Sequence, residues 1–267
     1  MLLTLLYLTI KFFPSMPASP PSKRKKRKKP PAPLNPETGR PYSPQTLKMR
    51  LLKRLKCTTK YEKQAWAAGA RLIAGVDEVG RGCIFGPVVA AAVILEPDYR
   101  IRGLRDSKLI DQQMREELAE KIRAHAIAWA VAAVDVARID QLNIYHASLL
   151  AMREAVSQLS PAPDHLLVDA VRIDWNGPQT NIIHGDALSA SIAAASIIAK
   201  VARDAMMRRW DPVYPQYDLA SNKGYQSPRH LAALLEHGPT PLHRLSFAPV
   251  WKRTVMQGEF EFEDCEP

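Results

Sequence analysis

The order in which apolar runs and helical patterns follow one another constrains the fold of this chain most. Two apolar runs typical of buried strands, 72–76 and 88–95, come one after the other, and later apolar runs alternate with segments of helical spacing. The later expected strands cover 127–136, 165–170 and 180–185, and the expected helices cover 47–70, 110–126, 139–159, 190–210 and 227–238. Strands that alternate with helices favour an α/β sheet covered by helices over a bundle or a sandwich.

The positive charge of the chain is concentrated near its beginning. The net charge is +10; residues 1–72 hold 17 Lys and Arg against 2 Asp and Glu, whereas residues 73–267 hold 20 against 25. Ten of the 22 prolines fall in the first 50 residues, around the run KRKKRKK at 23–29. We therefore expect 1–48 to be a disordered basic arm with non-specific affinity for nucleic acid. We expect 49–71 to be a helical lead-in, 72–250 the main domain, and 251–267 an acidic tail.

The extreme N-terminus and the cysteines bear on localisation. The apolar stretch 1–13 is interrupted by Lys11 and is too short to span a bilayer. We expect translation to start later, at Met16 or Met49; the alternative is a membrane-associated or secretory segment. The three cysteines have no metal-type spacing and form an odd set, which favours a reducing compartment. We expect a cytoplasmic monomer that does not bind membranes.

Acidic residues at the ends of apolar runs are the strongest chemical signal. Asp77 and Glu78 follow the first strand side by side and precede Gly-Arg-Gly, and Asp169 ends the strand at 165–170. Asp204 lies in the helix 190–210, one turn after Lys200. Carboxylates without a Cys or His pattern suit Mg²⁺ or Mn²⁺ rather than zinc. Because neighbouring strand residues point to opposite faces, Asp77 and Glu78 can share a site only where the strand ends or twists.

Other interpretations of these residues remain open or are excluded by spacing. Each carboxylate taken alone is also typical of a helix cap, a salt bridge or a solvated turn. Gly80, Gly82 and Gly86 resemble a dinucleotide-binding turn, but the spacing is one residue too long and a strand follows where a helix is required. The spacing therefore argues against a dinucleotide-dependent oxidoreductase. Two divalent ions on converging carboxylates would instead suit phosphodiester cleavage.

These carboxylates and the glycine turn lie in a segment, from about 72 to 247, that resembles the ribonuclease HII family. The resemblance rests on AGVDEVGRG (74–82), GPVVAAAVIL (86–95), LRDSKLI (104–110), IDQLNI (139–144), LLVDA (166–170), ASIAAASIIAKVARD (190–204), KGYQSPRH (223–230) and HRLSF (243–247). It implies a ribonuclease H-like fold, with a five-stranded mixed sheet flanked by helices and a C-terminal helical part. It also implies an endonuclease that cuts the RNA strand of RNA–DNA hybrids and incises 5′ to single ribonucleotides in duplex DNA. The expected products carry 3′-hydroxyl and 5′-phosphate ends.

The resemblance assigns roles to individual residues. The family's four metal-binding carboxylates fall on Asp77, Glu78, Asp169 and Asp204, with two ions expected when substrate is bound. The residues expected to bind substrate are Gly80, Arg81, Gly82, Lys108, Lys200 and Tyr225. Among these, the backbone of Gly80–Gly82 is expected to recognise the 2′-hydroxyl, and Tyr225 to pack on the sugar beyond the RNA-to-DNA junction.

The chain also departs from the family pattern. Cys83, Ile84 and Phe85 stand where Pro-Leu-Ala is common, which changes the wall beside the site, and Ser227 stands where threonine is usual. Two other functions remain as alternatives: a DNA-only nuclease on the same fold, and a non-catalytic protein that binds hybrids through its basic arm.

Overall fold

The computed structural model describes residues 39–43, 46–47, 50, 54–105 and 107–252. The chain divides into two units, 1–46 and 47–267, and the second carries the fold. The predicted arm lies almost entirely outside the described residues, as does most of the tail. None of the helices in the described ranges combines the length and apolar character needed to cross a bilayer.

Five strands form one mixed sheet, as predicted. They are β1 (Ile73–Val79), β2 (Val88–Leu95), β3 (Ala126–Val134), β4 (His165–Asp169) and β5 (Gln179–Ile182). Their order is β3-β2-β1-β4-β5, in which β1 pairs antiparallel with β2 and parallel with β4. The antiparallel half follows from the direct succession of the first two strands, and the parallel half requires the helical crossovers that the pattern contains.

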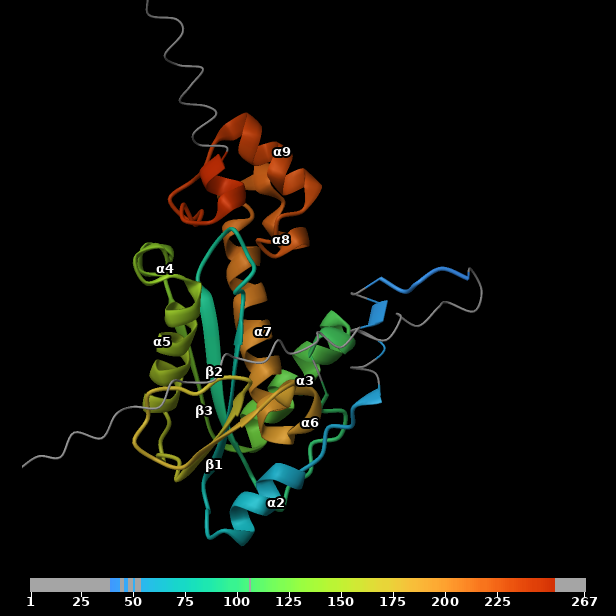
Figure 1. The fold of residues 1–267 in the computed structure, drawn as a ribbon, viewed down its shortest axis with the longest axis vertical. Helices are drawn as coiled ribbons and strands as arrows, with labels where there is room; N and C mark the ends of the chain where they lie inside the picture. The colour runs from blue at the N-terminus through green and yellow to red at the C-terminus, as the bar shows by residue number, and fades with distance from the viewer. Residues whose placement is uncertain (1–38, 44–45, 48–49, 51–53, 106, 253–267) are drawn as a thin grey trace, which may run out of the picture. The chain divides into compact units, whose positions relative to one another are not determined.

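Helices cover both faces of the sheet. The described helices are α2 (Lys60–Ala67), α3 (Gln112–His125), α4 (Val136–Leu142), α5 (Ile144–Ser157), α6 (Gly185–Leu188), α7 (Ala190–Trp210), α8 (Leu219–Asn222) and α9 (Pro228–His237), with short 3₁₀ turns at Ser107–Leu109 and Pro215–Tyr217. Helix α5 packs on the face that holds Ala74 and Val76, and α7 with α3 covers the face that holds Ala91 and Val93. Figure 1 shows α5 and α7 on opposite sides of the strands.

Helix α7 lies very close to β1. A Cβ built on Gly75 would lie 2.0 Å from the backbone carbon of Ser191, so only glycine permits this approach. The alanines of α7 let the rest of the helix approach the sheet in the same way, since Ala194, Ala195 and Ala199 are fully buried. This packing sets the position of every α7 side chain relative to the end of β1.

One expected helix is two helices. The sequence pattern predicts a single helix over 139–159, but α4 ends at Leu142 and α5 begins at Ile144. Asn143 between them has a φ of 67°, and its side-chain oxygen accepts hydrogen bonds from the backbone N–H groups of Tyr145 and His146. The prediction of one helix is wrong because Asn143 caps the second helix instead of continuing the first.

The C-terminal helical part is confirmed. Helices α8 and α9 follow α7 at one end of the sheet (Figure 1), around a core of Phe85, Tyr217 and Leu234. Phe85, one of the residues that departs from the family pattern, is fully buried in this core. The loop that follows the first strand is therefore anchored in the helical part.

Candidate active site

Asp77 and Asp169 lie next to each other on neighbouring parallel strands. Val76 pairs with Val168, so the two aspartates follow directly at the same level of the sheet. Burial raises the pKa of Asp77 well above its usual value, and the charges of Glu78 and Asp169 raise it further. Burial and then the charge of Asp186 raise the pKa of Asp169 to about 6. The two carboxylates predicted from strand ends are thus brought together, and they repel each other.

Asp186 is a third aspartate of this cluster, and it was not among the residues predicted from the sequence. It is buried in α6, and its charge raises the pKa of both Asp77 and Asp169. The turn before Asp186 is held against Asp169, because the Gly185 N–H donates to Oδ1 of Asp169 at 2.7 Å. A Cβ on Gly185 would lie 2.5 Å from Ile192. The available signal was that Asp186 directly follows the predicted strand 180–185, as Asp77 and Asp169 follow theirs.

Asp204 lies elsewhere. The Ser196 hydroxyl hydrogen-bonds Asp77, and Asp204 follows Ser196 by eight residues, which is about 12 Å along the helix axis. Oδ1 of Asp204 lies 2.7 Å from Nζ of Lys200. The structure therefore brings neither Asp204 nor Lys200 to the aspartate cluster. Because these two residues are four positions apart in α7, they form an ion pair with each other.

Glu78 lies near the end of β1, beside the cluster of Asp77, Asp169 and Asp186. It follows Asp77 in the strand and so points to the other face, yet its charge still raises the pKa of Asp77. Its Oε1 lies 3.1 Å from Nη1 of Arg81, a side chain that is 42% exposed. On the opposite side, Nζ of Lys108 lies 3.1 Å from Oδ2 of Asp186. Each of these two outer carboxylates therefore has a cationic neighbour.

Two fully buried arginines hold the glycine turn. Arg203 donates to the carbonyls of Phe85, Pro87 and Lys223 at 2.7–3.1 Å. Gly80 has a φ of 90°, and a Cβ there would lie 2.2 Å from Nε of Arg203. Arg244 donates to the carbonyls of Arg81 and Gly86. These arginines lie within quoted motifs, but their role emerges only from the fold, because their partners are backbone carbonyls distant in sequence.

Tyr225 lies beside this turn. A Cβ on Gly82 would lie 3.9 Å from Cε1 of the Tyr225 ring, which is 44% exposed. The Gly224 carbonyl accepts from the N–H groups of Ile84 and Phe85. The Gly80–Gly82 turn and Tyr225 therefore form one surface.

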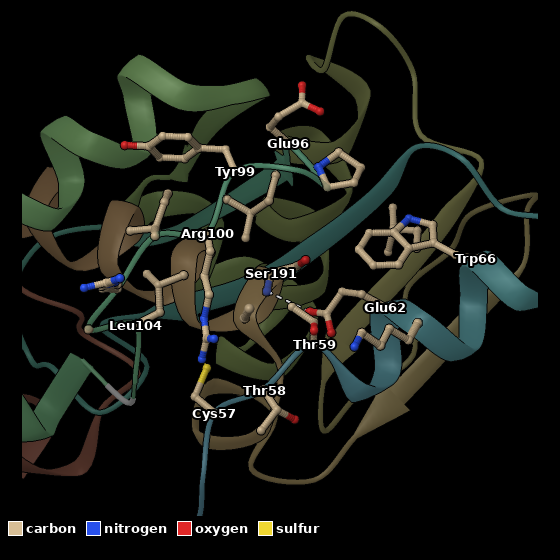
Figure 2. Close-up of a pocket in the computed structure, with 18 of the residues that line it drawn as sticks. Cys57, Thr58, Thr59, Glu62, Trp66, Glu96, Tyr99, Arg100, Leu104 and Ser191 are labelled. Carbon is tan, nitrogen blue, oxygen red and sulfur yellow. Dashed lines mark hydrogen bonds between the residues drawn. The ribbon is translucent and has the colours of Figure 1, made fainter.

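A separate cavity of about 530 Å³ lies at the N-terminal end of α7. Figure 2 shows Glu62 of α2 within it, directed at Ser191. Glu62 is 2% exposed, and its Oε1 accepts from the Ser189 hydroxyl at 2.7 Å and the Ser191 N–H at 2.9 Å. This buried carboxylate fastens the lead-in helix to the start of α7, just after Asp186.

We expect Glu62→Ala to lower the free energy of unfolding by about 2–4 kcal/mol, because two buried donors lose their acceptor. Glu62→Gln keeps an acceptor oxygen and is expected to lose less than half as much. Urea unfolding followed by circular dichroism measures both variants. Equal losses in the two variants would show that the negative charge of Glu62, rather than an acceptor oxygen at this place, stabilises the fold.

The comparisons with known proteins identify the family and the fold. The family model "Ribonuclease HII" matches residues 74–250. A ribonuclease HII of Koribacter versatilis is 66% identical over 230 residues, covering 86% of this chain and 91% of that protein. Two solved structures share the fold. The ribonuclease H2 of Pyrococcus horikoshii (TM-score 0.61, 24% identity) covers 73% of this chain and 100% of its own. A Bst-RNase HIII in complex with Mn²⁺ (TM-score 0.54, 19% identity) covers 84% and 77%.

The family match spans the aspartate cluster, the arginine-held turn and Tyr225, and the similarity to the curated relative extends over most of the chain. The fold is that of the ribonucleases H, and the family's activity is that of a ribonuclease H acting on nucleic acid. The chain belongs to the ribonuclease HII family.

Proposed function

We propose that this chain is a metal-dependent endonuclease that hydrolyses the RNA strand of RNA–DNA hybrids and incises 5′ to single ribonucleotides in duplex DNA. The observation that carries the proposal is the cluster of Asp77, Asp169 and Asp186, with Glu78 at its edge, next to the Gly80–Gly82 turn. Carboxylates that raise each other's pKa require a counterion if all are to be charged at neutral pH.

The donor set suits a hard divalent cation. The acidic side chains that converge here offer carboxylate oxygens, and Mg²⁺ and Mn²⁺ prefer oxygen ligands. Among the residues that the structure describes, no three acidic, His or Cys side chains are already arranged as a metal site. Asp186 and Glu78 are instead turned towards Lys108 and Arg81. We propose that Asp77, Glu78, Asp169 and Asp186 would hold the cations. Bound there, these would activate a water and stabilise the leaving oxygen, giving 3′-hydroxyl and 5′-phosphate ends.

The residues around the cluster are suited to recognise the substrate. Gly82 is exposed and has no side chain, so the backbone of the Gly80–Gly82 turn can approach a sugar edge closely, and this is where a 2′-hydroxyl would be read. The exposed face of the Tyr225 ring would pack on the neighbouring deoxyribose. Arg81 and Lys108 are both exposed and would meet phosphates when cations replace them at the carboxylates. The mutual placement of Gly82 and Tyr225 supports one recognition surface for an RNA-to-DNA junction.

The decisive experiment compares two duplexes of one sequence, with and without a single embedded ribonucleotide, in Mg²⁺, in Mn²⁺ and in EDTA. We expect incision only of the ribonucleotide duplex, only with a cation, and on the 5′ side of the ribonucleotide. Cleavage of both duplexes would identify a DNA nuclease on the same fold. Binding without products in either cation would identify a non-catalytic protein.

The basic arm supplies a separate prediction. Removing residues 1–48 deletes the run at 23–29, so we expect weaker substrate affinity and a shallower dependence of log Kd on log salt concentration. Turnover at saturating substrate should change little, since the aspartate cluster is untouched. Fluorescence anisotropy at several salt concentrations measures this, and an identical slope in the truncated protein would contradict it.

A further inference from the structure

Two buried histidines touch each other beneath the recognition surface. His230 of α9 and His243 are at most 1% exposed, and their Nε2 atoms lie 3.1 Å apart. Nδ1 of His230 lies 2.9 Å from the carbonyl oxygen of Tyr225, and Nδ1 of His243 lies 2.9 Å from the backbone nitrogen of Thr240. The four contacting groups form one continuous chain from Thr240 to Tyr225.

Only one arrangement of protons satisfies every contact in this chain when both rings are neutral. The Thr240 N–H can only donate, so Nδ1 of His243 is the acceptor and its proton is on Nε2. That proton is donated to Nε2 of His230, which leaves the proton of His230 on Nδ1, where it is donated to the Tyr225 carbonyl. Burial lowers the pKa of both rings, that of His243 to about 3, so both stay neutral at physiological pH.

This chain of hydrogen bonds links the two parts of the recognition surface, the Gly80–Gly82 turn and Tyr225. On one side, the ring of His243 stacks edge-on against Phe85 with centroids 5.0 Å apart, and the Gly86 N–H donates to the carbonyl of Leu242. Phe85 and Gly86 follow the Gly80–Gly82 turn. On the other side, His230 holds the carbonyl of Tyr225, which also accepts the N–H of Ser227 at 2.9 Å. A shift of either histidine would move the Tyr225 backbone relative to Gly82.

We propose that His230 and His243 are positioning residues, whose ordered hydrogen bonds fix the backbone of Tyr225 so that its ring stays beside Gly82. They do not touch the reacting atoms. The inference rests on the proposed function, because the ring of Tyr225 is assigned there to the sugar beyond the RNA-to-DNA junction. It assigns to this buried pair a role in substrate binding in addition to its packing in the C-terminal core.

Two substitutions of His230 separate positioning from packing. Asparagine places its amide nitrogen near the position of Nδ1, so His230→Asn keeps a donor for the Tyr225 carbonyl and loses His243. Glutamine places its amide near Nε2, so His230→Gln keeps an acceptor for His243 and loses the Tyr225 carbonyl. Both remove the aromatic ring, and we expect similar losses of thermal stability.

On a duplex with a single ribonucleotide, we expect His230→Gln to raise KM about tenfold with kcat little changed. His230→Asn should stay within about threefold of wild type. The KM effect of His230→Gln should vanish in a Tyr225→Ala background, while its loss of stability persists, as expected of residues that act through one another. Equal KM values for the two His230 variants, or a KM effect that persists without Tyr225, would overturn the proposal.

A measurement on the wild-type protein tests the same proposal without activity or variants. Nitrogen-15 NMR of the imidazole rings at neutral pH should show His243 protonated on Nε2 and His230 protonated on Nδ1. Any other tautomer pair would overturn the proposed chain of hydrogen bonds. Wild-type protein that incises no ribonucleotide duplex would instead reject the proposed function, and the tautomers would still decide whether the chain exists.

Discussion

We expect Asp186→Asn to lower the rate of cation-dependent cleavage by about three orders of magnitude, about 4 kcal/mol in activation free energy. Asp186 lies close enough to Asp77 and Asp169 to raise the pKa of both, so its oxygens are available to the same cation. Asparagine keeps the shape of the side chain but removes the charge that a divalent ion requires.

Asp204→Asn is the matched control. It makes the same chemical change on α7, next to Lys200 rather than in the cluster, and we expect activity within about tenfold of wild type. Single-turnover cleavage of a ribonucleotide-containing duplex in Mg²⁺ measures both variants, and circular dichroism confirms their folding. If Asp204→Asn lost cleavage and Asp186→Asn retained it, Asp204 would be the fourth cation ligand, which would contradict the proposed site.

We expect Asp169→Asn to stabilise the cation-free protein at pH 8 by about 2 kcal/mol, although it abolishes cleavage. The pKa of Asp169 is about 6 in the folded protein and 3.8 when unperturbed. Above pH 6 the folded protein therefore carries a charge that is disfavoured by burial and by Asp186. As the pH falls through 6 the folded protein takes up a proton before the unfolded chain does, and the penalty declines.

The gain from Asp169→Asn should therefore be largest at pH 8 and decrease below pH 6. Comparing the variant with wild type at each pH cancels the opposite effect of His230 and His243, whose lowered pKa values destabilise the fold in acid. Thermal unfolding in EDTA at several pH values measures the difference. Adding Mg²⁺ should stabilise wild type more than the variant. A gain independent of pH, or an Mg²⁺ effect of equal size in both, would contradict the proposed cation site.

The secondary structure was largely predictable because most elements carry one clear periodicity. The run at 88–95 and the centre of the run at 165–170, Leu166–Val168, are apolar throughout, as expected of strands buried on both faces, and both runs form strands. The predicted helix 47–70 is one exception, because residues 55–59 are not helical and α2 covers only Lys60–Ala67. Asn143 is another, and it has helical neighbours on both sides. A residue at positive φ that caps the next helix does not interrupt the apolar spacing, so a pattern of period 3.6 continues through it.

The site was predictable only where chemistry and sequence order coincide. Asp77, Glu78 and Asp169 end apolar strands, and parallel pairing places Asp77 beside Asp169. Asp204 belongs to a motif as prominent as any other, but a motif does not say how far along the helix axis a residue lies from the sheet end. Asp186 lies in a short helix of four residues that has no periodicity of its own.

By itself the sequence determined the family, the mixed sheet and the carboxylate chemistry, because these depend on local periodicity and on residue types in a recognisable order. Only the tertiary structure decided which aspartate completes the cluster and what holds the recognition turn. Asp186, Arg203, Arg244 and the two histidines act through atoms that are distant along the chain. Close packing of α7 and of the C-terminal helices against the sheet brings those atoms within reach of each other.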